Sequence, residues 1–189
     1  MKDKNTEVIK ALIESETKMN IRELSKKLGM NYKNAYNIVM RLNKEGIVSL
    51  ERLGQAVYCT LNKTIHHLIF QAEHERRSKL LKKSEFRAIH EKLNSLEFSF
   101  IALVFGSFAK GKATKGSDID FMAISEKGRA HEIEGRLSLL PFKIHLVSLT
   151  YEEFMGMAKS KEFSVVSEAI KSNIIFVGIE DYYRLVHDA

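Results

Sequence analysis

The 189-residue sequence contains one cysteine, one proline and no tryptophan. A single cysteine excludes an internal disulfide framework and a zinc site built from cysteine ligands, so Cys59 is best interpreted as a small core residue. No apolar run is long enough to span a membrane, and the first residues, MKDKNTEV, contain no signal-peptide hydrophobic region. We therefore expect a cytoplasmic protein with no membrane partner, built from many helices with short connections.

The composition is that of a folded protein, with 44% apolar and 29% charged residues, but its charge is uneven. Residues 1–62 contain 11 Lys and Arg against 7 Asp and Glu, and residues 63–97 contain 8 against 5. Residues 98–189 contain 11 against 12. The basic excess lies in the first half of the chain, which favours a polyanionic partner there.

Residues 1–62 show three amphipathic segments followed by two short apolar runs. The spacing predicts helices over 5–15 (capped by Asn5 or Thr6), 21–28 and 32–44, with Asn31 as the cap of the third. Strands are expected over 47–52 and 55–61, joined at Leu53-Gly54. This order resembles a winged helix-turn-helix domain, which implies that the third helix enters the DNA major groove and the hairpin lies over the backbone. Docking to another protein is the alternative use of such a domain.

The resemblance places candidate DNA-binding residues on the third helix and on the hairpin. Asn side chains pair with adenine, Lys and Arg suit guanine or phosphate, and tyrosines contact phosphate or thymine methyl groups. The candidates are Asn31, Tyr32, Lys33, Asn34, Asn37, Arg41 and Arg52.

Residues 63–97 are highly charged and carry an interrupted apolar stripe, which predicts a helical linker whose second helix restarts at Ser84. The linker is a candidate dimer contact, and a homodimer is expected because winged-helix regulators commonly bind paired half-sites.

The stretch IALVFGSFAKGKATKGSDIDFMAIS, residues 101–125, concentrates the candidate chemistry of the chain. A buried strand over 100–105 ends at Gly106-Ser107, and a basic connection leads to a second strand that begins at Ser117. Asp118 and Asp120 then share one face of that strand, and two close carboxylates indicate a magnesium site. The glycine lets the backbone approach a phosphate, to which the serine offers a hydroxyl and an amide.

GSFAKGKATKGSDID resembles the G-S…G…S-D-x-D signature of the nucleotidyltransferase superfamily related to DNA polymerase beta, in its minimal form. The resemblance implies that Gly106, Ser107, Lys110 and Ser117 bind the nucleotide and that Asp118 and Asp120 bind Mg²⁺ or Mn²⁺. It also implies transfer of a nucleoside monophosphate from a nucleoside triphosphate (NTP) to a hydroxyl, with pyrophosphate leaving. The resemblance continues to the C-terminal residues IIFVGIEDYYRLV.

One position departs from this family pattern. Active members usually supply a third carboxylate from a later strand, and the matching strand, expected over 142–149, contains no Asp or Glu. His145 occupies that place by alternation, where it is a candidate general base but a poor ligand for magnesium. The departure leaves phosphate and metal binding in place and leaves catalytic turnover open.

The remaining residues predict further helices over 126–140, 163–171 and 180–187 and a last strand over 173–177. Thr150 and Glu153 form a capping-box pattern that opens one more helix.

The sequence thus predicts an α+β protein. It consists of a winged helix-turn-helix over 1–62, a helical linker over 63–97 and a nucleotidyltransferase-like α/β domain with a mixed sheet over 98–189.

Three functions remain open: a DNA-binding nucleotidyltransferase, an antitoxin-like enzyme that modifies a partner protein, and a transcriptional regulator with an inactive transferase-like domain. A small-molecule nucleotidyltransferase of the antibiotic-modifying type is disfavoured, because it would have no need for the winged helix. In the regulator, the inactive domain serves as a nucleotide sensor or a dimerisation module.

Overall fold

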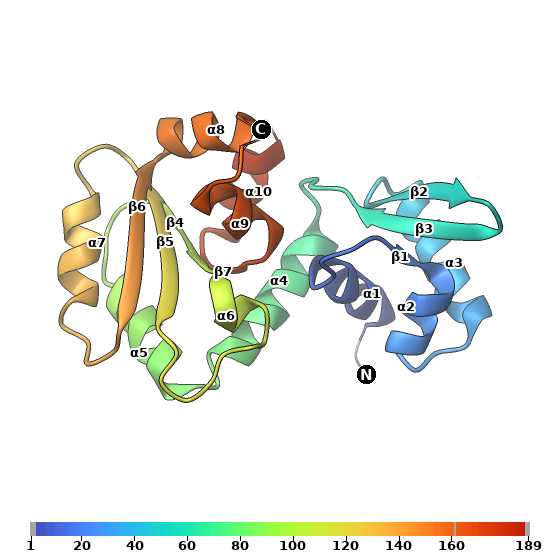
Figure 1. The fold of residues 1–189 in the computed structure, drawn as a ribbon, viewed down its shortest axis with the longest axis horizontal. Helices are drawn as coiled ribbons and strands as arrows, with labels where there is room; N and C mark the ends of the chain where they lie inside the picture. Colours follow the sequence, from blue (N-terminus) through green and yellow to red (C-terminus); the bar gives the residue numbers. More distant parts are fainter. Residues whose placement is uncertain (1–2, 161, 188–189) are drawn as a thin grey trace. The chain divides into compact units, whose positions relative to one another are not determined.

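A computed structural model describes residues 3–160 and 162–187 and divides the chain into two compact units, residues 1–74 and 75–189 (Figure 1). The boundary falls inside the segment expected to form a separate helical linker. That segment is therefore shared between the two units, and each unit is described by itself below.

The first unit combines four helical segments with a small antiparallel sheet. Its elements in chain order are α1 (Lys4–Ile13), β1 (Met19–Asn20), α2 (Ile21–Lys27), α3 (Tyr32–Lys44), β2 (Val48–Leu53), β3 (Ala56–Leu61) and the start of α4 (His67–Leu80).

Local capping chemistry explains where the helices of the first unit begin. The side chain of Asp3, not Asn5 or Thr6, caps α1 by accepting a hydrogen bond from the Asn5 amide, so that part of the prediction is wrong. The Asn31 side chain accepts from the Asn34 amide at 2.8 Å and caps α3, as predicted. An oxygen at this position satisfies a backbone N–H that the first helical turn leaves without a partner.

The sheet of the first unit has the strand order β1-β3-β2, with both pairs antiparallel. Leu53 pairs with Ala56, so Gly54 and Gln55 form the hairpin turn, and Gly54 adopts a positive φ of 61°. Cys59 on β3 is 1% exposed and burial raises its pKa to about 11, which confirms it as a core thiol.

The second unit contains the rest of α4 and a four-stranded sheet with helices on both faces. Its further elements are α5 (Ser84–Leu93), β4 (Phe100–Val104), α6 (Gly106–Ala109), β5 (Ile119–Ser125), α7 (Ala130–Leu137), β6 (Ile144–Thr150), α8 (Tyr151–Lys159), α9 (Val165–Lys171), β7 (Ile174–Val177) and α10 (Ile179–His187).

This sheet is mixed, with the strand order β6-β5-β4-β7. β4 is antiparallel to both β5 and β7, whereas β5 and β6 run parallel. A parallel pair needs a crossover connection, and α7 supplies it. The C-terminal end of β4 and the N-terminal ends of β5 and β6 consequently lie at the same end of the sheet.

Alternate residues of the strands divide the core between the two faces of the sheet. One face carries Ala102, Val104, Phe121 and Ala123, which cluster with buried side chains of α5 and α7. The intervening residues face the opposite side, where α8, α9 and α10 lie (Figure 1). Asp120 belongs to that second face, because its neighbours Ile119 and Phe121 are buried in the first.

Several predicted boundaries differ from the observed ones. β5 begins at Ile119, so Ser117 and Asp118 precede the strand instead of opening it. The helix expected over 126–140 is shorter, because α7 begins at Ala130 and ends at Leu137. Across residues 3–160 and 162–187, no helix combines the length and the apolar character that crossing a membrane requires.

Candidate functional site

The turn after β4 is shaped by one glycine. Gly106 has a positive φ of 63° and opens α6, which is only four residues long. A Cβ at this position would overlap the Oδ2 atom of Asp120. The carboxylate of Asp120 therefore lies directly against the glycine backbone, which fixes it at the entrance to the turn.

The two predicted aspartates stand at the start of β5, next to that turn. The Phe105 amide donates to the Asp120 carbonyl at 3.0 Å, and the Ile119 amide donates to the Lys143 carbonyl at 2.8 Å. These backbone bonds join the ends of three strands and position the side chains between them. Asp118 is exposed and Asp120 is partly buried.

His145 lies beside Asp120 on the neighbouring parallel strand. The register of β5 and β6 pairs the two residues, and His145 Nδ1 is 3.5 Å from Asp120 Oδ1. The imidazole is 69% exposed, so a ligand bound at this end of the sheet can reach it. The structure therefore brings together the glycine turn, Asp120 and the histidine at the place expected for a third carboxylate.

The donor set fits a metal held jointly with a substrate and does not fit a complete protein cage. Among the residues that the structure describes, no three His, Cys, Asp or Glu side chains come close enough together to hold a metal ion. Magnesium is commonly bound through one or two carboxylates together with substrate phosphates. Asp118 and Asp120 supply that number of carboxylates.

The two predicted nucleotide-binding serines differ in whether their hydroxyl groups are already engaged within the protein. The Ser107 hydroxyl has no hydrogen-bond partner among the described residues. Ser117 Oγ instead accepts from the Thr114 amide at 2.8 Å, so this side chain shapes the loop that precedes Asp118.

Glu168 is a residue of this region that sequence reasoning missed. Its Oε1 atom lies 2.7 Å from Lys110 Nζ, which ties the basic loop to α9. The two residues are 58 positions apart, and a lone glutamate in a short helix carries no pattern that predicts such a contact. Lys110 is thus already held by an acid, and its charge is partly neutralised.

A separate candidate surface for nucleic acid lies on α3. Its buried side chains are Ala35, Ile38, Val39 and Leu42, as the periodicity predicts. The candidate residues Tyr32, Lys33, Asn34, Asn37 and Arg41 are all exposed, and Arg52 on β2 is exposed as well.

Two of the candidates on α3 also have structural partners. Arg41 donates to Asn5 Oδ1 of α1. Asn31 is engaged as the helix cap, so its side chain is less available for a base than the exposed Asn34.

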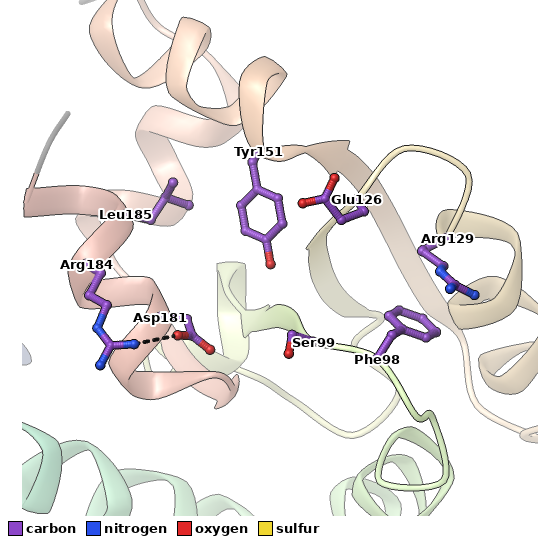
Figure 2. Close-up of a pocket in the computed structure, with 8 residues that line it drawn as sticks. All are labelled: Phe98, Ser99, Glu126, Arg129, Tyr151, Asp181, Arg184 and Leu185. Atoms are coloured by element: carbon purple, nitrogen blue, oxygen red, sulfur yellow. Dashed lines mark hydrogen bonds and ion pairs between the residues drawn. The ribbon is translucent and has the colours of Figure 1, made fainter.

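A cavity of the second unit lies at the opposite end of the strands and contains none of the predicted site residues. It measures about 620 Å³, and Tyr151 projects into it between Glu126 and Asp181 (Figure 2). Burial and these two carboxylates raise the pKa of Tyr151. Asp181 is paired with Arg184 at 3.2 Å. The residues that line this cavity are Phe98, Ser99, Glu126, Arg129, Tyr151, Asp181, Arg184 and Leu185.

Comparison with protein families finds two matches, one in each part of the chain. Residues 84–175 match the model of the nucleotidyltransferase domain. Residues 1–64 match a family model labelled HVO_A0114, a label that states no fold and no activity. No curated protein and no solved structure matches the chain.

The C-terminal part of the chain therefore carries a nucleotidyltransferase domain. The mixed sheet and its surrounding helices fit such a domain. The matched residues include the glycine turn, both aspartates, His145 and Glu168.

Proposed function

We propose that this protein binds DNA through residues 1–62, and that its nucleotidyltransferase domain binds an NTP with a divalent metal and transfers a nucleoside monophosphate to a hydroxyl. The observation that carries the proposal is the Asp120 carboxylate against the Gly106 turn, with His145 beside it. These groups lie together at one end of the sheet, and all of them belong to the residues that match the nucleotidyltransferase domain.

The residues divide the work of binding by their chemistry. The Ser107 hydroxyl and the backbone amides of the turn hold phosphate oxygens, and the missing Cβ of Gly106 leaves the space that the Asp120 carboxylate occupies beside them. Asp118 and Asp120 hold the divalent metal, which neutralises charge on the triphosphate and aligns the attacking and leaving oxygens.

The transfer step has a candidate proton acceptor in His145. The acceptor oxygen forms a bond to the α-phosphorus, the bond between the α-phosphorus and its bridging oxygen breaks, and pyrophosphate leaves. The hydroxyl proton passes to the His145 imidazole, which takes the place usually held by a third carboxylate.

DNA binding by residues 1–62 rests on the order of elements and on the exposed polar face of α3. Three helices and a two-stranded hairpin support a winged helix-turn-helix arrangement, in which α3 contacts base edges and Arg52 contacts the backbone. The net positive charge of this region supports the choice of DNA over protein docking.

Label transfer tests the proposed reaction. Purified protein is incubated with labelled ATP, CTP, GTP or UTP and with Mg²⁺ or Mn²⁺, and cell lysate supplies the acceptor. We expect transfer by the wild type and none by the Asp118→Asn/Asp120→Asn variant, which should still bind DNA. The matched control is Glu126→Gln/Asp181→Asn. This variant removes two carboxylates at the opposite end of the strands and should keep the activity.

A transcriptional regulator with an inactive nucleotide-sensing domain is the second candidate, and the lack of any Asp or Glu on β6, where active members usually supply a third carboxylate, favours it. Metal-dependent NTP binding without label transfer would select this candidate. Loss of DNA binding in the double-aspartate variant would contradict the separation of the two functions. If no NTP binds with either metal, both candidates fail.

A further inference from the structure

A second cavity in the nucleotidyltransferase unit has a composition that fits an anionic ligand. It measures about 550 Å³ and is lined in part by the loop that connects α6 to β5. Its lining combines apolar side chains with three lysines. The lining includes Lys83, Phe108, Lys115, Ser117, Phe142 and Lys143.

The positive charge of this cavity is not balanced by ion pairs. Within the described part of the chain, Lys115 and Lys143 form no ion pair, and Lys83 Nζ lies 4.8 Å from the centre of the Phe108 ring. Glu85 is the one acidic lining residue, and it accepts a hydrogen bond from the neighbouring Ser84 hydroxyl. Three ammonium groups against one carboxylate leave an excess that favours an anion.

The cavity shares Ser117 with the predicted NTP site, but its lining includes neither aspartate and no residue of the Gly106-Ser107 turn. Along β5 successive side chains point to opposite faces, so Ile119 lines this cavity while Asp120 faces the other side. Ser117 lines the cavity, and its hydroxyl also holds Thr114 within the loop that leads to Asp118. A ligand here would contact the side of the sheet opposite the Asp120 carboxylate.

We propose that this cavity is an effector site for a nucleoside monophosphate, bound without metal. The lysines bind its phosphate, and the apolar lining residues, Phe142 among them, contact its base and sugar. Occupancy sets the conformation of the 112–118 loop and so the placement of Asp118, and this regulatory part rests on the proposed function. The binding itself does not depend on that function.

Calorimetric titration of the full-length chain with AMP in the presence of EDTA tests the binding. EDTA removes the divalent metal that NTP binding at the aspartates requires. We expect wild type to bind, and Lys115→Gln/Lys143→Gln to raise the Kd at least about tenfold, because charge-assisted hydrogen bonds to the phosphate are lost. Lys92→Gln/Lys171→Gln, which changes two exposed lysines outside the cavity, and Asp118→Asn/Asp120→Asn should both keep the wild-type Kd.

Three results would overturn the assignment. They are an absence of AMP binding by wild type, an unchanged Kd in the cavity-lysine variant, and loss of binding in the double-aspartate variant. If inorganic phosphate binds as tightly as AMP, the proposed contact of the apolar lining residues with the base and sugar is wrong.

Regulation has its own readout in the same variants. Saturating AMP should change the Kd of metal-dependent NTP binding in wild type and leave it unchanged in Lys115→Gln/Lys143→Gln. An equal response of both proteins would overturn the regulatory coupling. Failure of label transfer alone would leave the AMP result intact, so the two proposals fail separately.

Discussion

At the scale of residues, the candidate active site depends on the absence of one methyl group. Gly106 combines a positive φ with a direct contact to the Asp120 carboxylate, and either feature alone disfavours any other residue. His145 then meets the same carboxylate from β6. Gly106, Asp120 and His145 come from three segments of the chain, and their contacts determine where the two carboxylate oxygens of Asp120 lie.

Replacing this glycine should separate backbone strain from loss of space. Gly106→Ala and Gly111→Ala both place a side chain at a positive φ, but only the first introduces a clash, because nothing lies within 4 Å of a Cβ at Gly111. We expect Gly111→Ala to lower the free energy of unfolding by about 1–2 kcal/mol through strain alone. Gly106→Ala should lower it further and abolish metal-dependent NTP binding.

Urea unfolding and NTP titration of the two variants measure these effects. Equal stability of the two proteins, with NTP binding retained in Gly106→Ala, would contradict the contact between Gly106 and Asp120.

At the scale of elements, α8 shows how a local sequence pattern sets a helix start. The Thr150 side chain accepts from the Glu153 amide at 3.2 Å, and Glu153 Oε2 accepts from the Thr150 amide at 2.7 Å. Hydrogen bonds from the Thr150 backbone and hydroxyl lower the pKa of Glu153. The predicted capping box is therefore confirmed.

This pKa shift predicts a pH-dependent contribution to stability. A carboxyl with a lowered pKa in the folded state stabilises the fold above its ordinary pKa, and this contribution is lost as the pH falls through the lowered value. Glu153→Ala should therefore lower the melting temperature at pH 7, and the difference from wild type should shrink in acid.

The control is Glu152→Ala, which removes an exposed carboxylate from the same helical turn outside the capping box. Thermal unfolding at several pH values makes the comparison. Identical pH profiles for the two variants would contradict the role given to the capping box.

At the scale of the whole molecule, charge is divided between the two parts of the chain. Residues 1–62 are basic, whereas residues 98–189 contain nearly equal numbers of acidic and basic side chains. This division matches the proposal that DNA is bound by the first part and a nucleotide by the second.

The salt dependence of DNA binding tests this division. If Lys33 contacts a phosphate, Lys33→Ala should weaken affinity and reduce the slope of log K against log salt by about 1. Arg41→Ala should weaken affinity too, and loss of its bond to Asn5 adds a local effect on α1.

The control is Lys92→Ala in the second unit, which should change neither affinity nor slope. Fluorescence anisotropy with a DNA duplex over a range of salt concentrations gives both quantities. An unchanged slope in Lys33→Ala would remove this residue from the DNA contacts.

The sequence alone determined the features that depend on neighbouring residues. Helix periodicity identified the buried face of α3, and capping residues identified the starts of α3 and α8. The restart of a helix at Ser84 followed from the serine and the glutamate after it. Strand alternation placed Ile119 and Asp120 on opposite faces of the sheet. These features need only short-range sterics and local hydrogen bonds.

Tertiary structure alone decided which distant segments meet. The resemblance assigns His145 to the place of a third carboxylate, but its contact with Asp120 depends on the parallel register of β5 and β6. The close approach of the Asp120 carboxylate to Gly106 and the ion pair between Lys110 and Glu168 also depend on how strands and helices pack. The second cavity likewise assembles residues from Lys83 to Lys143. Such contacts arise from the packing of the whole sheet, which no local pattern of side chains encodes.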